Sequence, residues 1–187
     1  MTRSHRFHLV WRALYVVAGT FALLLILTGG VYLAGGRWNI SPSTPLGLYW
    51  VSRTPIAVGA FVMVCPPDTP IFQQARERTY IEAGSCPGHY GHMIKQVVAL
   101  AGDVIAITTQ GVRVNGHLLP DSAPTSHDPK GRAMPVTLGA QYTLGSRQLL
   151  LMGLGNRLAF DGRYFGPVGT ETVRTVLKPI YTWTPRE

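Results

Sequence analysis

Lysine and acidic residues are scarce in this sequence of 187 residues, although its formal net charge is +8. Only three of the 17 basic residues are lysines, and only nine residues are Asp or Glu. The arginines are scattered without a run of four or five basic residues, so the charge does not indicate a nucleic-acid partner. With so few acids, the candidates for a carboxylate role are limited, and Asp161, close to Arg163, stands out among them.

Several common sequence patterns are also missing. The sequence has no internal repeat, no heptads, no phosphate loop of the Gly-x-x-x-x-Gly-Lys type and no Gly-x-Ser-x-Gly nucleophile elbow. These absences argue against repeat proteins, coiled coils, phosphate-loop nucleotide hydrolases and α/β-hydrolases. At this length, one compact domain of about 150 residues is expected beyond the N-terminal segment.

Charge is absent from the whole stretch between Ala13 and Gly36, which is long enough to cross a bilayer. Residues 1–12 carry three arginines and no acid, so the positive-inside rule places this tail in the cytoplasm. Residues 13–36 are then a transmembrane anchor, and residues 37–187 form a domain on the far side of the membrane. A signal peptide cleaved near the small residues 34–36 is the alternative, and it exports the domain equally.

Cysteine occurs only at Cys65 and Cys86. An exported compartment permits a disulfide between them, which would close the polar loop 66–85 and stabilise it by roughly 3 kcal/mol. The alternative is a tetrahedral zinc site in which His89 and His92 join the two thiolates. We favour the disulfide and expect no metal, because glycines and a proline interrupt the Cys86–His92 segment without the usual paired knuckle spacing.

Beyond the anchor, short apolar runs alternate with turn residues, which predicts a mainly β, antiparallel domain. The Asn115-Gly116 pair predicts a tight hairpin between residues 112–114 and 117–119. One short helix is expected at Ile71–Arg78, and residues 120–135 read as a polar loop. Further strands are predicted at residues 58–64, 96–100, 104–107, 141–144, 148–152 and 173–177.

Ser43 lies in the stretch Ser41-Pro42-Ser43-Thr44-Pro45, where two hydroxyl residues alternate with two prolines. Proline fixes φ and removes a backbone donor, so this segment is stiff, extended and non-helical. A nucleophile benefits from such restraint, because its orientation is set before the reaction. Clusters of Ser, Pro, Thr and Gly are also typical of ordinary surface turns, and the stretch by itself does not separate the two interpretations.

Lys95 alone interrupts the apolar run from Met93 to Leu100. In a strand, the side-chain alternation puts it on one face with Met93, Val97 and Ala99. Partial desolvation would then lower the pKa of the Lys95 ammonium toward neutrality, and a neutral amine can act as a base. The alternative is an edge-strand lysine whose side chain reaches water and discourages strand pairing.

These motifs, taken in order, resemble those of the type I signal peptidases over nearly the whole chain. A basic tail and a membrane span precede Ser-x-Ser-x-Pro-x-Gly, then Lys-x-Val-x-x-x-x-Gly-Asp, an Asn-Gly hairpin and Asp-Gly-Arg-Tyr-Phe-Gly-Pro. The spacing Ser43-x-Pro45, the cysteine pair and the terminal segment Lys178–Trp183 are similar to the TraF-type peptidases of bacterial conjugation systems. The resemblance implies a signal-peptidase-like antiparallel β domain that follows one transmembrane helix. It also implies that the helix lies in the bacterial inner membrane and that residues 37–187 form a serine/lysine peptidase domain in the periplasm.

The resemblance also implies roles for individual residues. Ser43 falls on the nucleophile, Lys95 on the general base, and Ser41 with the Ser43 backbone N–H on the oxyanion hole. Asp161 falls on the C-terminal box of the family as a third catalytic residue. The serine that orients the lysine in the family is replaced by Ala159, so Lys95 needs another positioning group, with Asp161 as the candidate.

A serine peptidase of this type would act through an acyl-enzyme and without a cofactor. The resemblance implies a pilin-like precursor as substrate, with other conjugation or type IV secretion components as partners. Attack on the acyl-enzyme by water gives cleavage, whereas attack by the substrate's own N-terminus gives a cyclic product, and both stay open. A non-catalytic periplasmic envelope assembly protein and a zinc-binding periplasmic protein are the two alternative functions.

Overall fold

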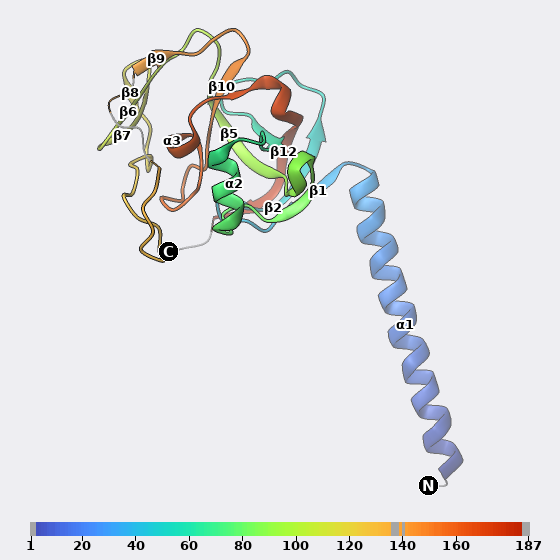
Figure 1. Ribbon diagram of the computed structural model, residues 1–187. Coiled ribbons are helices and arrows are strands. Elements are labelled where there is room, and N and C mark those ends of the chain that lie inside the picture. Colours follow the sequence, from blue (N-terminus) through green and yellow to red (C-terminus); the bar gives the residue numbers. More distant parts are fainter. Residues whose placement is uncertain (1–2, 136–138, 140, 185–187) are drawn as a thin grey trace. The chain divides into compact units, whose positions relative to one another are not determined.

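The computed structural model describes residues 3–135, 139 and 141–184, and it divides into two compact units, Met1–Arg37 and Trp38–Glu187. Strands dominate the second unit, and every strand pairing for which the register is known is antiparallel (Figure 1). The sequence-based expectation of a mainly β, antiparallel domain after one N-terminal helix is therefore confirmed.

The N-terminal helix α1 runs over Arg3–Leu33. Its segment Trp11–Leu33 is long and apolar enough to cross a membrane, a test that a signal sequence near the N-terminus also passes. Helical structure begins at Arg3, so residues 3–12 of the predicted basic tail continue the helix. The predicted side of the membrane remains a prediction.

The larger sheet has seven strands in the order β1-β2-β12-β3-β5-β10-β11. Their bounds are Gly36–Asn39 for β1, Leu46–Ser52 for β2, Phe61–Val64 for β3, Met93–Ala99 for β5, Gln148–Met152 for β10, Val168–Gly169 for β11 and Val173–Trp183 for β12. β12 is the longest of them and pairs with both β2 and β3.

The smaller sheet has the order β8-β7-β6-β9 and gathers at one end of the second unit (Figure 1). Its strands are β6 at Val104–Thr108, β7 at Gly111–Val114, β8 at His117–Leu118 and β9 at Gln141–Thr143. The predicted hairpin is confirmed, because β7 pairs with β8 across Asn115 and Gly116, both of which have positive φ. Positive φ at both central residues is the requirement of a type I′ turn.

Two clusters of buried side chains form the core of the second unit. One cluster packs between the larger sheet and the short helix α2, Pro70–Glu77, with Val62, Leu151 and Phe72 at its centre. The other packs against the smaller sheet and includes Ile105 and Leu150. Neighbouring residues of β10 thus point into different clusters, as the side-chain alternation of a strand requires.

Several boundaries differ from the sequence-based expectation. β1 and β2 were not predicted, because Gly47 and the aromatic run Tyr49-Trp50 lack a clean polar and apolar alternation. β3 begins at Phe61 rather than at residue 58, because Gly59 adopts φ = 89° just before it. The predicted loop 120–135 contains one isolated antiparallel bridge, between His127 and Ala133. Four further short elements complete the described fold, namely α3 at Gly162–Phe165, β4 at Ala83–Cys86 and the helical turns Pro87–His89 and Thr170–Thr172.

Cys65 and Cys86 form a disulfide, as predicted. Both residues are buried in the first core cluster. Sulfur atoms bonded to each other are not thiolate ligands, so the zinc alternative loses two of its four proposed ligands. His92 lies near the disulfide and is exposed.

We expect the variant Cys65→Ser to lower the melting temperature of the protein. Opening the loop returns conformational entropy to the unfolded chain, which destabilises by roughly 3 kcal/mol in the chain-entropy model. Thermal unfolding of the full-length variant, compared with that of the oxidised wild type, checks this. The wild type under reducing conditions is a control, since it also lacks the disulfide. A melting temperature equal to that of the oxidised wild type would contradict it.

Candidate active site

The segment from Ser41 to Thr44 folds around the side chain of Asn39, the last residue of β1. The Asn39 amide nitrogen lies 3.0 Å from the carbonyl oxygen of Ser41, 3.1 Å from that of Thr44 and 2.9 Å from that of Pro45. The Asn39 Oδ1 atom accepts a hydrogen bond from Ser41 N at 3.1 Å. Asn39 is only 6% exposed, so these bonds are shielded from water and hold the segment in one conformation.

Ser43 is half-buried in this segment, and its hydroxyl has a polar neighbour. Ser41 Oγ donates a hydrogen bond to Ser43 Oγ at 3.2 Å. The Asn156 side-chain amide donates to the Pro42 carbonyl at 3.0 Å, so a second loop fixes the same segment. The structure therefore brings the two predicted hydroxyl residues together and restrains the backbone that carries them.

Lys95 is the third residue of β5, which lies between β3 and β10 inside the larger sheet. Its side chain is buried, with only 3% of the residue exposed. This position excludes the alternative of an edge-strand lysine that reaches water. Met93 and Val97 pack against the first core cluster, as predicted for one face of the strand.

The prediction for Ala99 was wrong, because it packs into the second cluster. Ala99 pairs with Leu150 and Val97 pairs with Leu151, so β5 has one residue, Val98, that β10 does not match. A β-bulge of this kind interrupts the alternation of side chains between the two faces. Sequence alternation alone does not show where such a bulge occurs.

Burial lowers the pKa of the Lys95 ammonium from 10.5 to about 8. The nearby Asp161 carboxylate acts in the opposite direction and raises this pKa, whereas the Arg163 guanidinium lowers it. Lys95 is therefore within electrostatic reach of both residues. With a pKa near 8, a substantial fraction of the amine is neutral just above physiological pH.

Two contacts bring the Ser43 segment to the strands β5 and β10. Thr44 Oγ1 lies 3.5 Å from the carbonyl oxygen of Ile94, the residue before Lys95. Gly153, which directly follows β10, lies against the Ser43 carbonyl, and a Cβ at this position would collide with that oxygen. The absence of a side chain at Gly153 thus allows the serine backbone to approach the end of β10.

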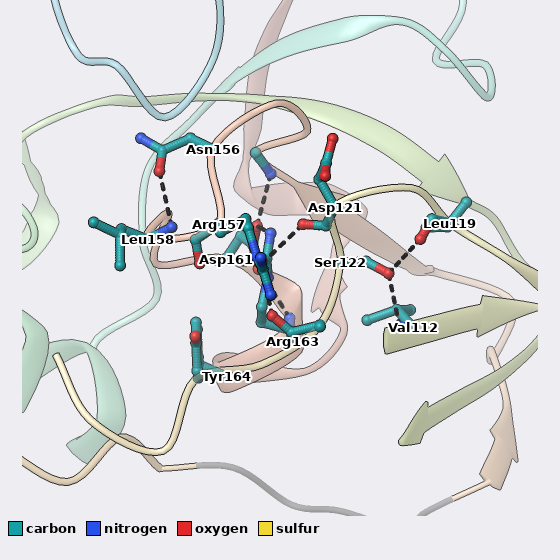
Figure 2. Close-up of polar contacts among 12 residues, drawn as sticks. Val112, Leu119, Asp121, Ser122, Asn156, Arg157, Leu158, Asp161, Arg163 and Tyr164 are labelled. Carbon is teal, nitrogen blue, oxygen red and sulfur yellow. Dashed lines mark hydrogen bonds and ion pairs between the residues drawn. The ribbon is translucent and has the colours of Figure 1, made fainter. Parts of the chain in front are cut away.

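Asp161 and Arg163 form a fully buried ion pair, each with 0% exposure (Figure 2). Arg163 donates from Nε to Asp161 Oδ1 and from Nη2 to Asp161 Oδ2, both at 2.8 Å. The remaining Arg163 nitrogen, Nη1, donates to the backbone carbonyls of Asp121, Ala123 and Arg157 at 3.2 to 3.3 Å. The guanidinium therefore ties the loop before α3 to the polar loop that begins after β8.

The Asp161 carboxylate also accepts backbone hydrogen bonds, from Gly153 N at 2.8 Å and from Arg163 N at 3.1 Å. The second of these caps the short helix α3, Gly162–Phe165. Both carboxylate oxygens are thus engaged with groups other than a substrate. The geometry favours a positioning role for Asp161, exerted on Lys95 through its charge.

The family model described as signal peptidase, peptidase S26 matches residues 7–183 of this chain. The chain belongs to the S26 signal peptidase family. It is 51% identical, over 90% of its length and 95% of the relative's, to the plasmid transfer protein TraF of Escherichia coli. It is also 32% identical, over 93% of its length and 98% of the relative's, to the conjugal transfer protein TraF of Agrobacterium tumefaciens strain 15955.

Sequence reasoning within this S26 chain missed three residues that shape the site, namely Asn39, Gly153 and Asn156. Asn39 precedes the serines and can bond its own backbone two residues further on, which is a recognisable property of asparagine before a turn. Gly153 and Asn156 carry no such local signal, because their contacts are with the Pro42–Ser43 backbone more than a hundred residues away.

Proposed function

We propose that this S26 chain is a membrane-anchored serine endopeptidase with Ser43 as nucleophile and Lys95 as general base. Its substrate class would be an exported, pilin-like precursor, in keeping with the transfer proteins to which it is similar. The single observation that carries the proposal is the burial of Lys95 inside β5, beside the restrained Ser43 segment. A lysine in this setting has the lowered pKa that a base near neutral pH requires.

In the proposed reaction, neutral Lys95 removes the Ser43 proton while Ser43 Oγ attacks the carbonyl carbon of the scissile peptide bond. The negative charge that develops on the carbonyl oxygen is stabilised by the Ser43 backbone N–H and the Ser41 hydroxyl. The protonated Lys95 then returns its proton to the leaving amine, which gives the acyl-enzyme. Attack by water releases a free carboxylate, and attack by an amine of the substrate forms a new peptide bond.

The acyl-enzyme provides a test that does not depend on knowing the natural substrate. Full-length protein in detergent is incubated at pH 8.5 with p-nitrophenyl acetate, and the peptide that contains Ser43 is examined by mass spectrometry. We expect an acetyl group on Ser43 in the wild type and none in Lys95→Met. Labelling of Ser52, a half-buried serine at the end of β2, to the same extent as Ser43 would contradict the proposal and favour the non-catalytic envelope protein.

We also propose that residues beyond α1 lie in the periplasm. The apolar segment Trp11–Leu33, the arginines before it and the disulfide between Cys65 and Cys86 support this placement. Fusion of alkaline phosphatase to the C-terminus checks it, because this enzyme folds only where disulfides form. Absence of phosphatase activity from a stably produced fusion would place the domain in the cytoplasm.

We expect kcat/KM to rise with pH through the pKa of Lys95, which burial lowers to about 8. The base must be neutral, so the rate should rise about tenfold per pH unit well below pH 8 and level off above it. A pH profile from 6 to 10 checks this, and a flat profile would contradict lysine as the base. Stability should rise in the window between about 8 and 10.5, because only there does the unfolded chain bind the additional proton.

We expect Asn39→Ala to lower kcat by roughly 100-fold, because the segment that carries Ser43 loses the amide that holds the carbonyls of Ser41, Thr44 and Pro45. The lost hydrogen bonds should destabilise the fold by about 1–3 kcal/mol. Asn115→Ala is the control, since the Asn115 side chain makes two hydrogen bonds of its own but lies in the turn between β7 and β8. Kinetics and thermal unfolding of both variants check this, and equal kcat losses would contradict a positioning role for Asn39.

A further inference from the structure

A pocket of about 250 Å³ lies beside the loop that holds the nucleophile segment. It is called the cationic pocket here, and three separate parts of the chain line it. These are Arg78, Thr79 and Tyr80 after α2, then Thr125, Asp128, Pro129, Lys130, Arg132 and Met134, and finally Leu158 and Phe160.

Positive charge exceeds negative charge in this pocket, because Arg78, Lys130 and Arg132 face a single carboxylate, that of Asp128. The carboxylate is already engaged by Arg132 Nε at 2.6 Å, by the Tyr80 hydroxyl at 2.6 Å and by two backbone N–H groups. Within the part of the chain that the structure describes, neither Arg78 nor Lys130 forms a salt bridge. Arg78 Nη1 donates to the Ala133 carbonyl at 2.7 Å, so its positive charge is anchored at the pocket without being neutralised, and the Lys130 ammonium adds a second charge that can attract an anion.

The pocket also has an apolar wall. Tyr80 and Phe160 pack ring to ring with centroids 5.5 Å apart, and the Tyr80 hydroxyl lies 3.4 Å from the Met134 sulfur. Leu158 adds a side chain that is 59% exposed to solvent. The combination of an apolar wall and two unpaired cations suits a ligand that joins a hydrophobic group to a carboxylate.

The loop 153–161 connects this pocket to the nucleophile segment. Asn156 donates to the Pro42 carbonyl at 3.0 Å, and Leu158, two residues further on, lines the pocket. Two residues span at most about 7 Å of chain. A peptide attached to Ser43 would therefore reach the near wall of the pocket within about six of its own residues.

We propose that the cationic pocket binds a carboxylate of the peptide substrate, together with a neighbouring apolar side chain. The proposal rests on the proposed peptidase function, and it names the part of the substrate that lies outside the scissile bond. An aspartate or glutamate side chain and a free C-terminus would both supply the carboxylate. Electrostatic attraction to Arg78 and Lys130 should help to recruit such a peptide at low ionic strength.

Binding to the inactive variant Ser43→Ala tests the pocket without any need for turnover. The probe is the peptide N-acetyl-Ala-Leu-Phe-Asp, titrated by calorimetry into the full-length protein in detergent micelles. Three further versions replace Asp by Asn, amidate the C-terminus, or do both. We expect the peptide without any carboxylate to bind at least tenfold more weakly than the parent, and the two single replacements identify which carboxylate is used.

The protein variants Arg78→Gln and Lys130→Gln should each weaken binding of the parent peptide about fivefold to tenfold. Lys130 is exposed, and its side chain forms no hydrogen bond with the residues that the structure describes, so this variant remains informative if Arg78→Gln misfolds. Arg147→Gln is the matched control, because it removes one exposed positive charge outside the pocket. It should leave the dissociation constant unchanged.

Three results would overturn the proposal. The first is equal binding of the parent peptide and the carboxylate-free peptide, and the second is no binding of the parent peptide at all. The third is an affinity for the parent peptide that Lys130→Gln leaves unchanged. The proposed function has a separate readout, the acetyl group on Ser43. Carboxylate-dependent binding without acylation would refute the peptidase proposal and retain the pocket as a peptide site. Acylation of Ser43 without carboxylate-dependent binding would refute the pocket proposal and retain the peptidase proposal.

Discussion

Ser43→Ala and Lys95→Met should each lower peptide turnover by at least a factor on the order of 1000, because nucleophile and base act in the same step. The double variant should be scarcely slower than either single variant, since groups that act as a unit are not additive. Steady-state kinetics on a precursor peptide, with residual rates measured at high enzyme concentration, check both statements.

Folding of the Lys95→Met variant is expected to be intact or improved at neutral pH. Methionine fills a similar volume in the sheet and removes a charge whose burial is unfavourable, as the lowered pKa of Lys95 shows. Lys178→Met is the matched control, because Lys178 is exposed on β12. Its turnover should equal that of the wild type, and a rate loss comparable to that of Lys95→Met would contradict the assignment of the base.

The fold was predictable from sequence wherever a local rule decides the structure. The Asn115-Gly116 turn demands positive φ at both residues, and the hairpin forms there. The disulfide was also predictable, because an exported chain with two cysteines has one pairing to make. The pairing of β12 with β2 was not, since it joins residues near 50 to residues near 180, and no local pattern specifies such a partner.

In the candidate site, likewise, the features that a local sequence pattern specifies were predictable and those that depend on distant contacts were not. Lys95 was recognisable because a single charge in an apolar run needs a physical reason, and its burial and lowered pKa agree with that reasoning. The bulge at Val98 was not recognisable, because it arises from the pairing register between β5 and β10, in which Val98 has no partner residue. The sequence identifies Arg163 only as a neighbour of Asp161. Its side-chain bonds to five acceptor atoms form only when the polar loop and the loop before α3 lie side by side.

The buried pair of Asp161 and Arg163 should carry the largest effect on stability in the domain. Asp161→Asn leaves the Arg163 guanidinium buried without its counter-charge, which should cost about 3–5 kcal/mol. Replacing both residues, in Asp161→Asn with Arg163→Met, should cost less than the sum of the two single replacements, because no unpaired charge is then left in the core. Denaturant unfolding of Asp161→Asn, Arg163→Met and the double variant checks this coupling between the residues.

Arg132→Met is the control for this cycle. It also removes an arginine from an ion pair, but its partner Asp128 keeps hydrogen bonds from Tyr80 and from two backbone N–H groups. The Arg132 side chain is about one third exposed, so its loss should cost about 1 kcal/mol or less. An equal cost for Arg132→Met and Asp161→Asn would contradict a special role for the buried pair.

The variants Asp161→Asn and Arg163→Met should move the pH profile in opposite directions if the ion pair sets the pKa of Lys95. The Asp161 carboxylate raises the pKa of Lys95, so Asp161→Asn should lower this pKa and shift the rising limb of kcat/KM to more acidic pH. The Arg163 guanidinium lowers the pKa of Lys95, so Arg163→Met should shift the limb to more alkaline pH. Profiles measured on variants that remain folded at low temperature distinguish this electrostatic role from a structural one, because general destabilisation lowers the rate without shifting the two limbs apart.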